Sequence, residues 1–180
     1  MDSYNYDDII IKAYSNNDFE DYLQMQLEDK IYEYYDKDLI RKTFKETLSD
    51  TSRTENYSIF LSEGMTYCGN IELQKYPDSY ALGIKLSEKY QHRGIGTLAV
   101  KIFCQYCFED HGITQLVIRI DPDNKISIRL FEKLGAIYTG KKLTPEFERL
   151  ISSSKRSFPE SEVERLGANH YILNLPIIEQ

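Results

Sequence analysis

The segment QHRGIG, residues 91–96, places two glycines, Gly94 and Gly96, directly before an apolar helical pattern. Glycine lets a ligand approach the backbone closely, and the first N–H groups of a helix have no partner within it. Such groups lie at the positive end of the helix dipole and bind phosphate or pyrophosphate. His92 and Arg93 stand beside the glycines and favour an anion site. A tight strand-to-helix turn without a ligand is the alternative.

Two common phosphate motifs do not fit this segment. The dinucleotide fingerprint requires a third glycine, but Ala99 stands at that position. The P-loop requires a Gly-Lys-Ser/Thr ending, which does not follow. A nucleotide-binding protein that uses the same glycine turn therefore stays open only as a weaker alternative.

Cysteine and histidine spacing raises the question of a metal. Cys104, Cys107 and His111 recur at i, i+3 and i+7 of one predicted helix, which could supply three zinc ligands. No fourth ligand is apparent, so we expect the cysteines to be buried as small apolar residues and predict no metal site. The odd number of cysteines favours reduced thiols over a disulfide framework.

The elements that must position these residues follow from periodicity. Apolar alternation and turn residues predict strands at 9–14, 57–62, 67–76, 80–87, 114–121, 136–143 and 169–175. Helical periodicity predicts helices at 17–29, 36–48, 95–110 and 124–134, with Asn17 as N-cap and Glu20 three residues on. Residues 143–167 interrupt the last two strands as an insert. This order predicts an α/β (α+β) fold with a mixed central sheet of six or seven strands flanked by helices.

Length and charge narrow the function classes. The 180 residues fit a single domain spanning 1–180, and the formal net charge of −7 argues against nucleic-acid binding. No apolar run approaches the ~18 residues of a membrane span. The N-terminal segment is acidic and has no apolar signal region, so we expect a cytoplasmic location and no membrane partner.

At Gln91–Gly96 the sequence resembles the acyl-CoA motif Q/R-x-x-G-x-G/A of the GNAT superfamily of N-acetyltransferases. The preceding LGIKLSEKY resembles that family's central strand, and DPDNKISIRLFEKLGAIYTG resembles its second motif. The resemblance extends from Ile9 to Leu175. The pattern around Asn124 and Ser127 is most similar to the branch that acetylates ribosomal-protein N-termini and polyamines.

The resemblance implies a cofactor site for acetyl-CoA as co-substrate, in a V-shaped gap between residues 84–86 and 116–120. The backbone of Ile84, Lys85 and Leu86 would pair with the pantetheine arm, and the Leu86 N–H would face the thioester carbonyl. Asn124 matches a CoA-contacting asparagine, although it could equally cap a helix. The pyrophosphate would be held by the backbone of the glycine segment, namely His92, Arg93, Gly94, Ile95, Gly96 and Thr97.

The catalytic residues are less clearly marked. An amine with a pKa near 10.4 is protonated at neutral pH, so a base is needed. Glu72 is the first candidate because it alternates with Ile71 and Leu73, and Tyr80 is the second. Either could instead be a surface or packing residue.

Two positions depart from the family pattern. Phe131 stands where many members carry a tyrosine that protonates the thiolate, which leaves Ser127 as the nearest matching hydroxyl. Arg119 stands where some ribosomal-protein acetyltransferases carry a glutamate base.

We therefore predict acetyl transfer from acetyl-CoA to a primary amine by direct attack in a ternary complex. The acceptor would be a polyamine-like small molecule or a protein N-terminus, because the first two helices are rich in acidic residues that attract cations. These residues are Asp18, Glu20, Asp21, Glu28, Asp29, Glu33, Asp36 and Asp38. A catalytically weak acyl-CoA sensor on the same fold is the alternative. We expect the 143–167 insert to shape acceptor access or self-association, which leaves a homodimer open.

Overall fold

The computed structural model describes residues 4–6, 8–29, 36–143, 161 and 167–177. Within these ranges the strands form a single mixed sheet in the order β1-β2-β3-β4-β5-β6-β8-β7. Their bounds are β1 Tyr4–Tyr6, β2 Ile9–Ala13, β3 Thr54–Leu61, β4 Thr66–Tyr76, β5 Ser79–Leu86, β6 Gln115–Ile120, β7 Ile137–Lys142 and β8 Ala168–Asn174. The expected mixed sheet is confirmed, with the short β1 as an additional strand.

The predicted helices are confirmed with small changes at their ends. They are α1 Phe19–Leu27, α2 Lys37–Ser49, α3 Ile95–His111 and α4 Lys125–Lys133. The predicted cap at Asn17 is wrong, because a 3-10 turn, Asn16–Asp18, leads into α1 and Ser15 is the residue that precedes this turn. The backbone N–H of Ser15 donates to Asp18 Oδ2 at 2.9 Å. Asp18 is held there because Ser58 also donates to it from β3, a long-range contact that local spacing does not reveal.

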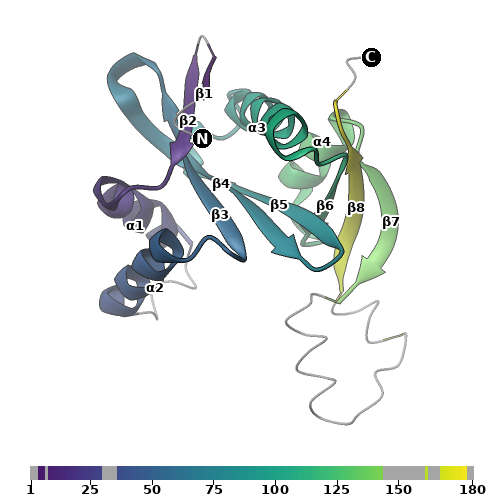
Figure 1. Ribbon diagram of the computed structural model, residues 1–180, viewed down its shortest axis with the longest axis horizontal. Coiled ribbons are helices and arrows are strands. Elements are labelled where there is room, and N and C mark those ends of the chain that lie inside the picture. Colours follow the sequence, from purple (N-terminus) through teal and green to yellow (C-terminus); the bar gives the residue numbers. More distant parts are fainter. Residues whose placement is uncertain (1–3, 7, 30–35, 144–160, 162–166, 178–180) are drawn as a thin grey trace.

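The helices form layers on the two faces of the sheet (Figure 1). Helices α1 and α2 lie against β4 and β3, whereas α3 contacts β2 and β5 from the other side. The side chains of β4 alternate accordingly: Ile71 and Leu73 are fully buried in the core with α3, while Asn70 and Glu72 point to the α1 side. One face of the central strands is thus apolar core and the other is polar.

Strands β5 and β6 are the parallel pair in a sheet whose other ladders are antiparallel. Their ladder has one register pair, Ala81 opposite Val117, and Figure 1 shows the two strands diverging beyond it. The backbone of β5 after Ala81 therefore has no strand partner on that side among the described residues. The insert at 143–167 lies almost wholly outside these residues.

Candidate active site

The glycine segment, residues 91–96, leads into helix α3. Gly94 is the N-cap residue with a φ of 81°, a left-handed conformation that favours glycine. The first helical bond runs from Leu98 N to Gly94 O at 3.1 Å, so the N–H groups of Ile95, Gly96 and Thr97 precede the helical ladder. The expected turn geometry, with backbone N–H groups outside the helical ladder at the start of α3, is present; anion binding there stays a prediction.

Gly96 is required for a different reason, namely the close approach of α4. A Cβ atom at Gly96 would lie 3.0 Å from Leu130 Cδ1 and 3.4 Å from Leu86 Cδ1. Gly96 lines a cavity of about 740 Å³ together with residues of β5, the glycine segment and α4. We call it the cofactor cavity because several residues that the sequence motif predicts to bind the cofactor line it. Its lining residues are Glu28, Asp29, Ile84, Lys85, Leu86, Glu88, Gln91, Gly96, Asn124, Ile126, Ser127 and Leu130.

The backbone of β5 presents alternate polar groups to this cavity. Ser87 N donates to Cys68 O on β4 at 2.9 Å, so the N–H of the preceding residue, Leu86, points away from β4. The same alternation directs the backbone N–H and C=O groups of Ile84 toward the cavity and those of Lys85 toward β4. Leu86 O accepts from Gln91 Nε2 at 3.0 Å, which ties the glycine segment to the strand. Ile84 and Leu86 are therefore the residues whose backbone a ligand strand could pair with.

Asn124 and Ser127 lie together at the start of α4. Asn124 is the N-cap, and its side chain accepts from Ser127 N at 3.0 Å, so the helix-capping function expected as an alternative is confirmed. Both residues also line the cofactor cavity. His92 and Arg93 are exposed beside Gly94, and Arg93 lies over the Tyr90 ring with its guanidinium carbon 5.7 Å from the centroid.

A second cavity, of about 410 Å³, lies on the polar face of the sheet beneath α1. We call it the polar cavity; its lining residues are Tyr14, Tyr22, Gln26, Asp29, Asn56, Asn70, Glu72, Gly83, Ile84 and Lys85. Asp29, Ile84 and Lys85 line both cavities, so the two spaces meet along the end of β5.

Glu72 is the central acidic group of the polar cavity. It lies opposite Gly83 on β5, and a Cβ atom there would come within 2.7 Å of Glu72 Oε1. Burial raises the pKa of the Glu72 carboxyl, and the hydrogen bond from Gln74 Nε2 at 2.6 Å opposes that rise. Glu72 is therefore a half-buried carboxylate that lines a cavity, and not the fully solvent-facing strand residue that was its alternative interpretation.

Lys85 supplies a cation beside the same space. Its Nζ donates to Gln26 Oε1 at 2.9 Å and lies 4.0 Å from Asp29 Oδ2. Burial lowers the pKa of Lys85, while the nearby carboxylates of Asp29 and Glu28 oppose this shift. The polar cavity thus combines two carboxylates and one ammonium group with several neutral hydrogen-bonding groups.

Tyr80 does not join these residues. It is 39% exposed at the beginning of β5, opposite Lys75, and lines neither cavity. Because side chains alternate along β5, Tyr80 lies on the other face of the sheet from Gly83. We leave it out of the site proposed below.

Sequence reasoning missed the polar neighbours of Glu72. Asn70 and Gln74 recur at every second position with Glu72, and Asn56 faces it from β3. Polar residues at every second position of an otherwise apolar hairpin could have indicated this polar cluster from the sequence. Glu28 was noted only as an acidic residue; its carboxylate accepts from Ser87 Oγ and from Glu88 N, and so ties the end of α1 to the cofactor cavity.

Most acidic residues of the first two helices take part in ion pairs or hydrogen bonds within the fold. Asp18 is buried against Lys12, Glu20 pairs with exposed Arg41, and Asp36 caps α2. Glu33 lies outside the described residues. Asp29 and Glu28 are the members of this group that line the cavities.

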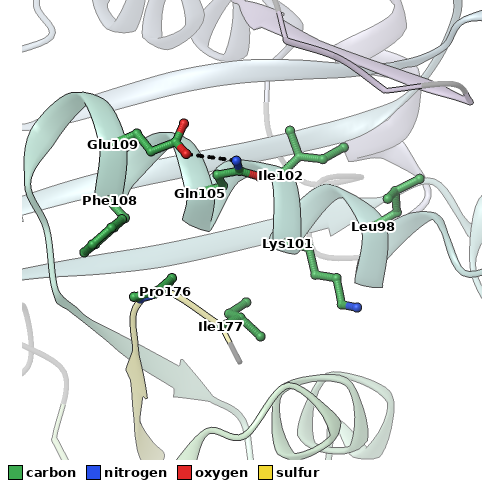
Figure 2. Close-up of a pocket in the computed structure, with 8 residues that line it drawn as sticks. All are labelled: Leu98, Lys101, Ile102, Gln105, Phe108, Glu109, Pro176 and Ile177. Carbon is green, nitrogen blue, oxygen red and sulfur yellow. Dashed lines mark hydrogen bonds between the residues drawn. The ribbon is translucent and has the colours of Figure 1, made fainter. Parts of the chain in front are cut away.

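A third cavity, of about 500 Å³, lies along α3 and apart from these two (Figure 2). Leu98, Ile102 and Phe108 line it from the helix, and Pro176 and Ile177 face them from the segment after β8. It shares no lining residue with the cofactor or polar cavity.

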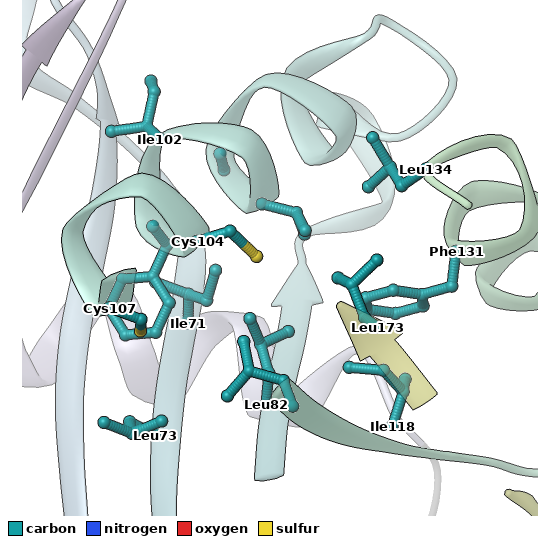
Figure 3. Packing of buried hydrophobic residues seen from close by; sticks show 14 of the residues in the cluster. Ile71, Leu73, Leu82, Ile102, Cys104, Cys107, Ile118, Phe131, Leu134 and Leu173 are labelled. Atoms are coloured by element: carbon teal, nitrogen blue, oxygen red, sulfur yellow. The ribbon is translucent and has the colours of Figure 1, made fainter. Parts of the chain in front are cut away.

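Phe131 belongs to the core and lines neither the cofactor nor the polar cavity (Figure 3). Phe131 is 3% exposed, and its ring points from α4 toward Leu173. Cys104 and Cys107 are buried in the same cluster, where burial raises the pKa of both thiols. His111 lies outside this core, and its Nε2 shares a hydrogen bond with Tyr106 Oη at 2.7 Å.

Comparison with known proteins agrees with this geometry. The family model described as an acetyltransferase (GNAT) domain matches residues 8–137. The chain belongs to the GNAT acetyltransferase family. It is therefore an N-acetyltransferase of a family that uses acyl-CoA. No curated protein matches the chain.

Solved structures share the fold at low identity. An acetyltransferase from Agrobacterium tumefaciens is 20% identical with a TM-score of 0.71, covering 97% of this chain and 95% of that one. The ribosomal-protein acetyltransferase RimL in complex with coenzyme A is 13% identical, with a TM-score of 0.74 and coverages of 96% and 97%. Spermidine N-acetyltransferase from Vibrio cholerae, in complex with CoA and spermine, is 12% identical, with a TM-score of 0.71 and coverages of 94% and 96%. Among the described residues, no helix is long and apolar enough to cross a membrane.

Proposed function

We propose that this protein transfers an acetyl group from acetyl-CoA to a primary amine by direct attack within a ternary complex. The observation that carries the proposal is the junction of two cavities along β5. One is lined by Gln91, Gly96 and Asn124, and the other is lined by Glu72. A thioester in the first and an amine in the second would meet at Ile84 and Lys85, so no acyl-enzyme step is needed.

Acetyl-CoA would be held mainly by backbone groups. The N–H groups from His92 to Thr97 would bind the pyrophosphate, and the exposed backbone of Ile84 and Leu86 would pair with the pantetheine arm. Bound acetyl-CoA would supply the activated thioester carbonyl. The Leu86 N–H, which points to the cavity, would stabilise the negative charge that develops on the carbonyl oxygen.

Glu72 would act as the general base. Its half-buried carboxylate, with a raised pKa, can accept a proton from the attacking ammonium group. The amine nitrogen then bonds to the carbonyl carbon, the carbon–sulfur bond breaks, and the electron pair leaves on the sulfur. Ser127 lines the cofactor cavity and is our candidate hydroxyl for hydrogen bonding to that sulfur. A thiol pKa of about 8.5 means that the thiolate can also leave without a proton donor.

The acceptor would be a polyamine-like small molecule or a protein N-terminus. Asp29 and Glu72 in the polar cavity favour an ammonium group, and the neighbouring structures include enzymes named for ribosomal protein and for spermidine. Lys85 limits this negative charge, so we expect one cationic group of the acceptor to be held in the cavity itself.

We further propose that residues 1–180 form one domain and that the 143–167 insert shapes acceptor access or self-association. Replacing residues 145–167 with a short turn tests this proposal. Changed acceptor kinetics or a changed solution mass supports a role for the insert, including a homodimer contact. Unchanged kinetics and mass in the folded variant would leave the insert as a passive loop.

The experiment for the activity is coenzyme A release, measured with acetyl-CoA and a panel of spermidine, a basic peptide, a neutral amine and an acidic peptide. We expect release with the cationic acceptors and a strong loss in Glu72→Gln, while calorimetry shows unchanged acetyl-CoA binding. The loss should be largest at pH values where Glu72 is ionised and the amine is still protonated, and it should shrink at lower pH as the parent carboxylate itself takes up a proton. Binding of acetyl-CoA without turnover on any amine would instead favour a catalytically weak acyl-CoA sensor.

A further inference from the structure

A chain of hydrogen bonds connects Arg119 on β6 to Glu72 on β4. Arg119 Nη1 donates to Tyr76 Oη at 3.1 Å, and Tyr76 Oη donates to Gln74 Oε1 at 2.8 Å. Gln74 Nε2 then donates to Glu72 Oε1 at 2.6 Å. A longer contact of 3.5 Å joins Arg119 Nη1 directly to Gln74 Oε1.

The direction of this chain follows from its first member. A guanidinium group has only donors, so the Tyr76 oxygen accepts from Arg119 and its own hydrogen is free for Gln74. The Gln74 oxygen is then occupied by donors, which leaves its NH₂ group to face Glu72. A rotated amide would place NH₂ against the Tyr76 and Arg119 donors and its oxygen against the carboxylate. Both contacts would be repulsive while Glu72 is ionised.

Small residues on β5 allow the side chains to meet. Gln74 lies opposite Ala81, and Ala81 lies opposite Val117 of β6. Arg119 follows two positions after Val117 and therefore lies on the same face of the sheet. Because Ala81 and Gly83 fill little space between the strands, Arg119 can reach over β5 to β4. Its guanidinium carbon lies 4.6 Å from the Tyr76 ring centroid, which holds it there.

We propose that Gln74, oriented by Tyr76 and Arg119, is a positioning residue that fixes the Glu72 carboxylate and keeps it ionised for proton transfer. The kinetic consequence rests on the proposed function, in which Glu72 is the base. This assigns to Arg119 a role in the reaction although it carries no acid–base group that titrates near neutral pH. The hydrogen bond favours the charged form of Glu72, whereas burial favours the neutral form.

Other charged or titratable groups also face Glu72 and must be considered in any pH experiment. They come from each element around the polar cavity, namely Tyr14 after β2, Tyr22 and Asp29 from α1 and the turn after it, Tyr76 from β4, Lys85 from β5 and Arg119 from β6. None of these other groups is substituted in Gln74→Met. The variant removes the amide donor to Glu72 and also the acceptor of Tyr76 and Arg119, whose own contributions the further variants measure.

The test measures the ionisation of Glu72 directly. Side-chain carboxyl carbons are followed by ¹³C NMR against pH, and the Glu72 signal is assigned by its loss in Glu72→Gln. In Gln74→Met the titration midpoint should rise by about one to two pH units, because a hydrogen bond to the carboxylate is lost. The acid limb of the kcat/KM profile should move by the same amount. An unchanged midpoint in folded Gln74→Met would overturn the proposal.

Three further variants separate positioning from folding. Tyr76→Phe keeps the ring under Arg119 but removes the hydroxyl, so it should raise the midpoint by less than Gln74→Met. Arg119→Met should act in the same direction, and Arg119→Lys should restore part of the effect because it retains a donor. Loss of activity in these variants without movement of the midpoint would show a merely structural role and contradict the proposal.

Gln105→Met is the matched control. Gln105 Nε2 donates to Glu109 Oε1 at 2.9 Å on the exposed surface of α3, so the same change removes a similar bond far from the cavity. It should leave the Glu72 midpoint and kcat/KM unchanged. If Glu72→Gln were fully active, the proposed base would be wrong, but the NMR titration would still decide whether Gln74 controls Glu72.

Discussion

Gly83 provides a sensitive test of where Glu72 must lie. In Gly83→Ala the new Cβ atom would lie 2.7 Å from Glu72 Oε1 and 2.9 Å from Glu72 Cγ. Ordinary contact begins at 3.4 Å, so the carboxylate has to retreat by about 0.7 Å. The Glu72 side chain can move, whereas the backbone of the paired strands cannot, so the fold should persist.

The expected loss follows from that displacement. A catalytic group misplaced by about 1 Å can cost roughly 10²-fold in rate, so a 0.7 Å shift should lower kcat/KM by roughly 10- to 100-fold. Acetyl-CoA binding by calorimetry should not change, because Gly83 does not line the cofactor cavity. Thermal stability should remain close to that of the parent, since alanine in a strand regains about 0.5–1 kcal/mol of backbone entropy against the strain.

A double-mutant cycle supplies the control for Gly83→Ala. If the substitution acts through Glu72, it should cost little further activity in a Glu72→Gln background. Equal losses in both backgrounds would mean that Gly83 contributes through acceptor space and not through the carboxylate. Full activity of the single variant with an unchanged pH profile would refute the assignment of Glu72 as the base.

Three other expectations follow from the structure. Gly96→Val should abolish measurable acetyl-CoA binding in calorimetry, because its side chain would meet Leu130 and occupy the cofactor cavity; parent-like binding would refute the site. Glu72→Gln should raise the melting temperature at neutral pH. Burial raises the folded-state pKa of Glu72, so the parent loses stability as the pH rises through that pKa. A higher melting temperature of the variant that persists at pH 4 would contradict this. Phe131→Tyr should destabilise the fold by about 1–3 kcal/mol in denaturant titration without raising kcat, since its hydroxyl would be buried in the core; a faster enzyme would contradict the packing role.

The backbone geometry of the glycine turn and of the α4 cap was predictable because its physics is local. The N–H groups that precede α3, the left-handed Gly94 and the Asn124 cap depend on residues within one helical turn of each other. The same holds for Glu72 facing away from Ile71, because alternation is intrinsic to a strand. Residue types and short spacings therefore determined the shape of the glycine turn, the choice of Glu72 as base candidate and most element positions.

The tertiary structure alone decided how these pieces face each other. Strand β8 lies between β6 and β7, and the cap of the first helix depends on Ser58 from a strand 40 residues away. The contacts of the acidic residues in the first two helices, such as Glu20 with Arg41, also depend on long-range packing. Arg119 meets Glu72 through Gln74 only because sheet register brings Ala81 and Gly83 between them. Register is set by the packing of the whole sheet, which no short spacing in the sequence encodes.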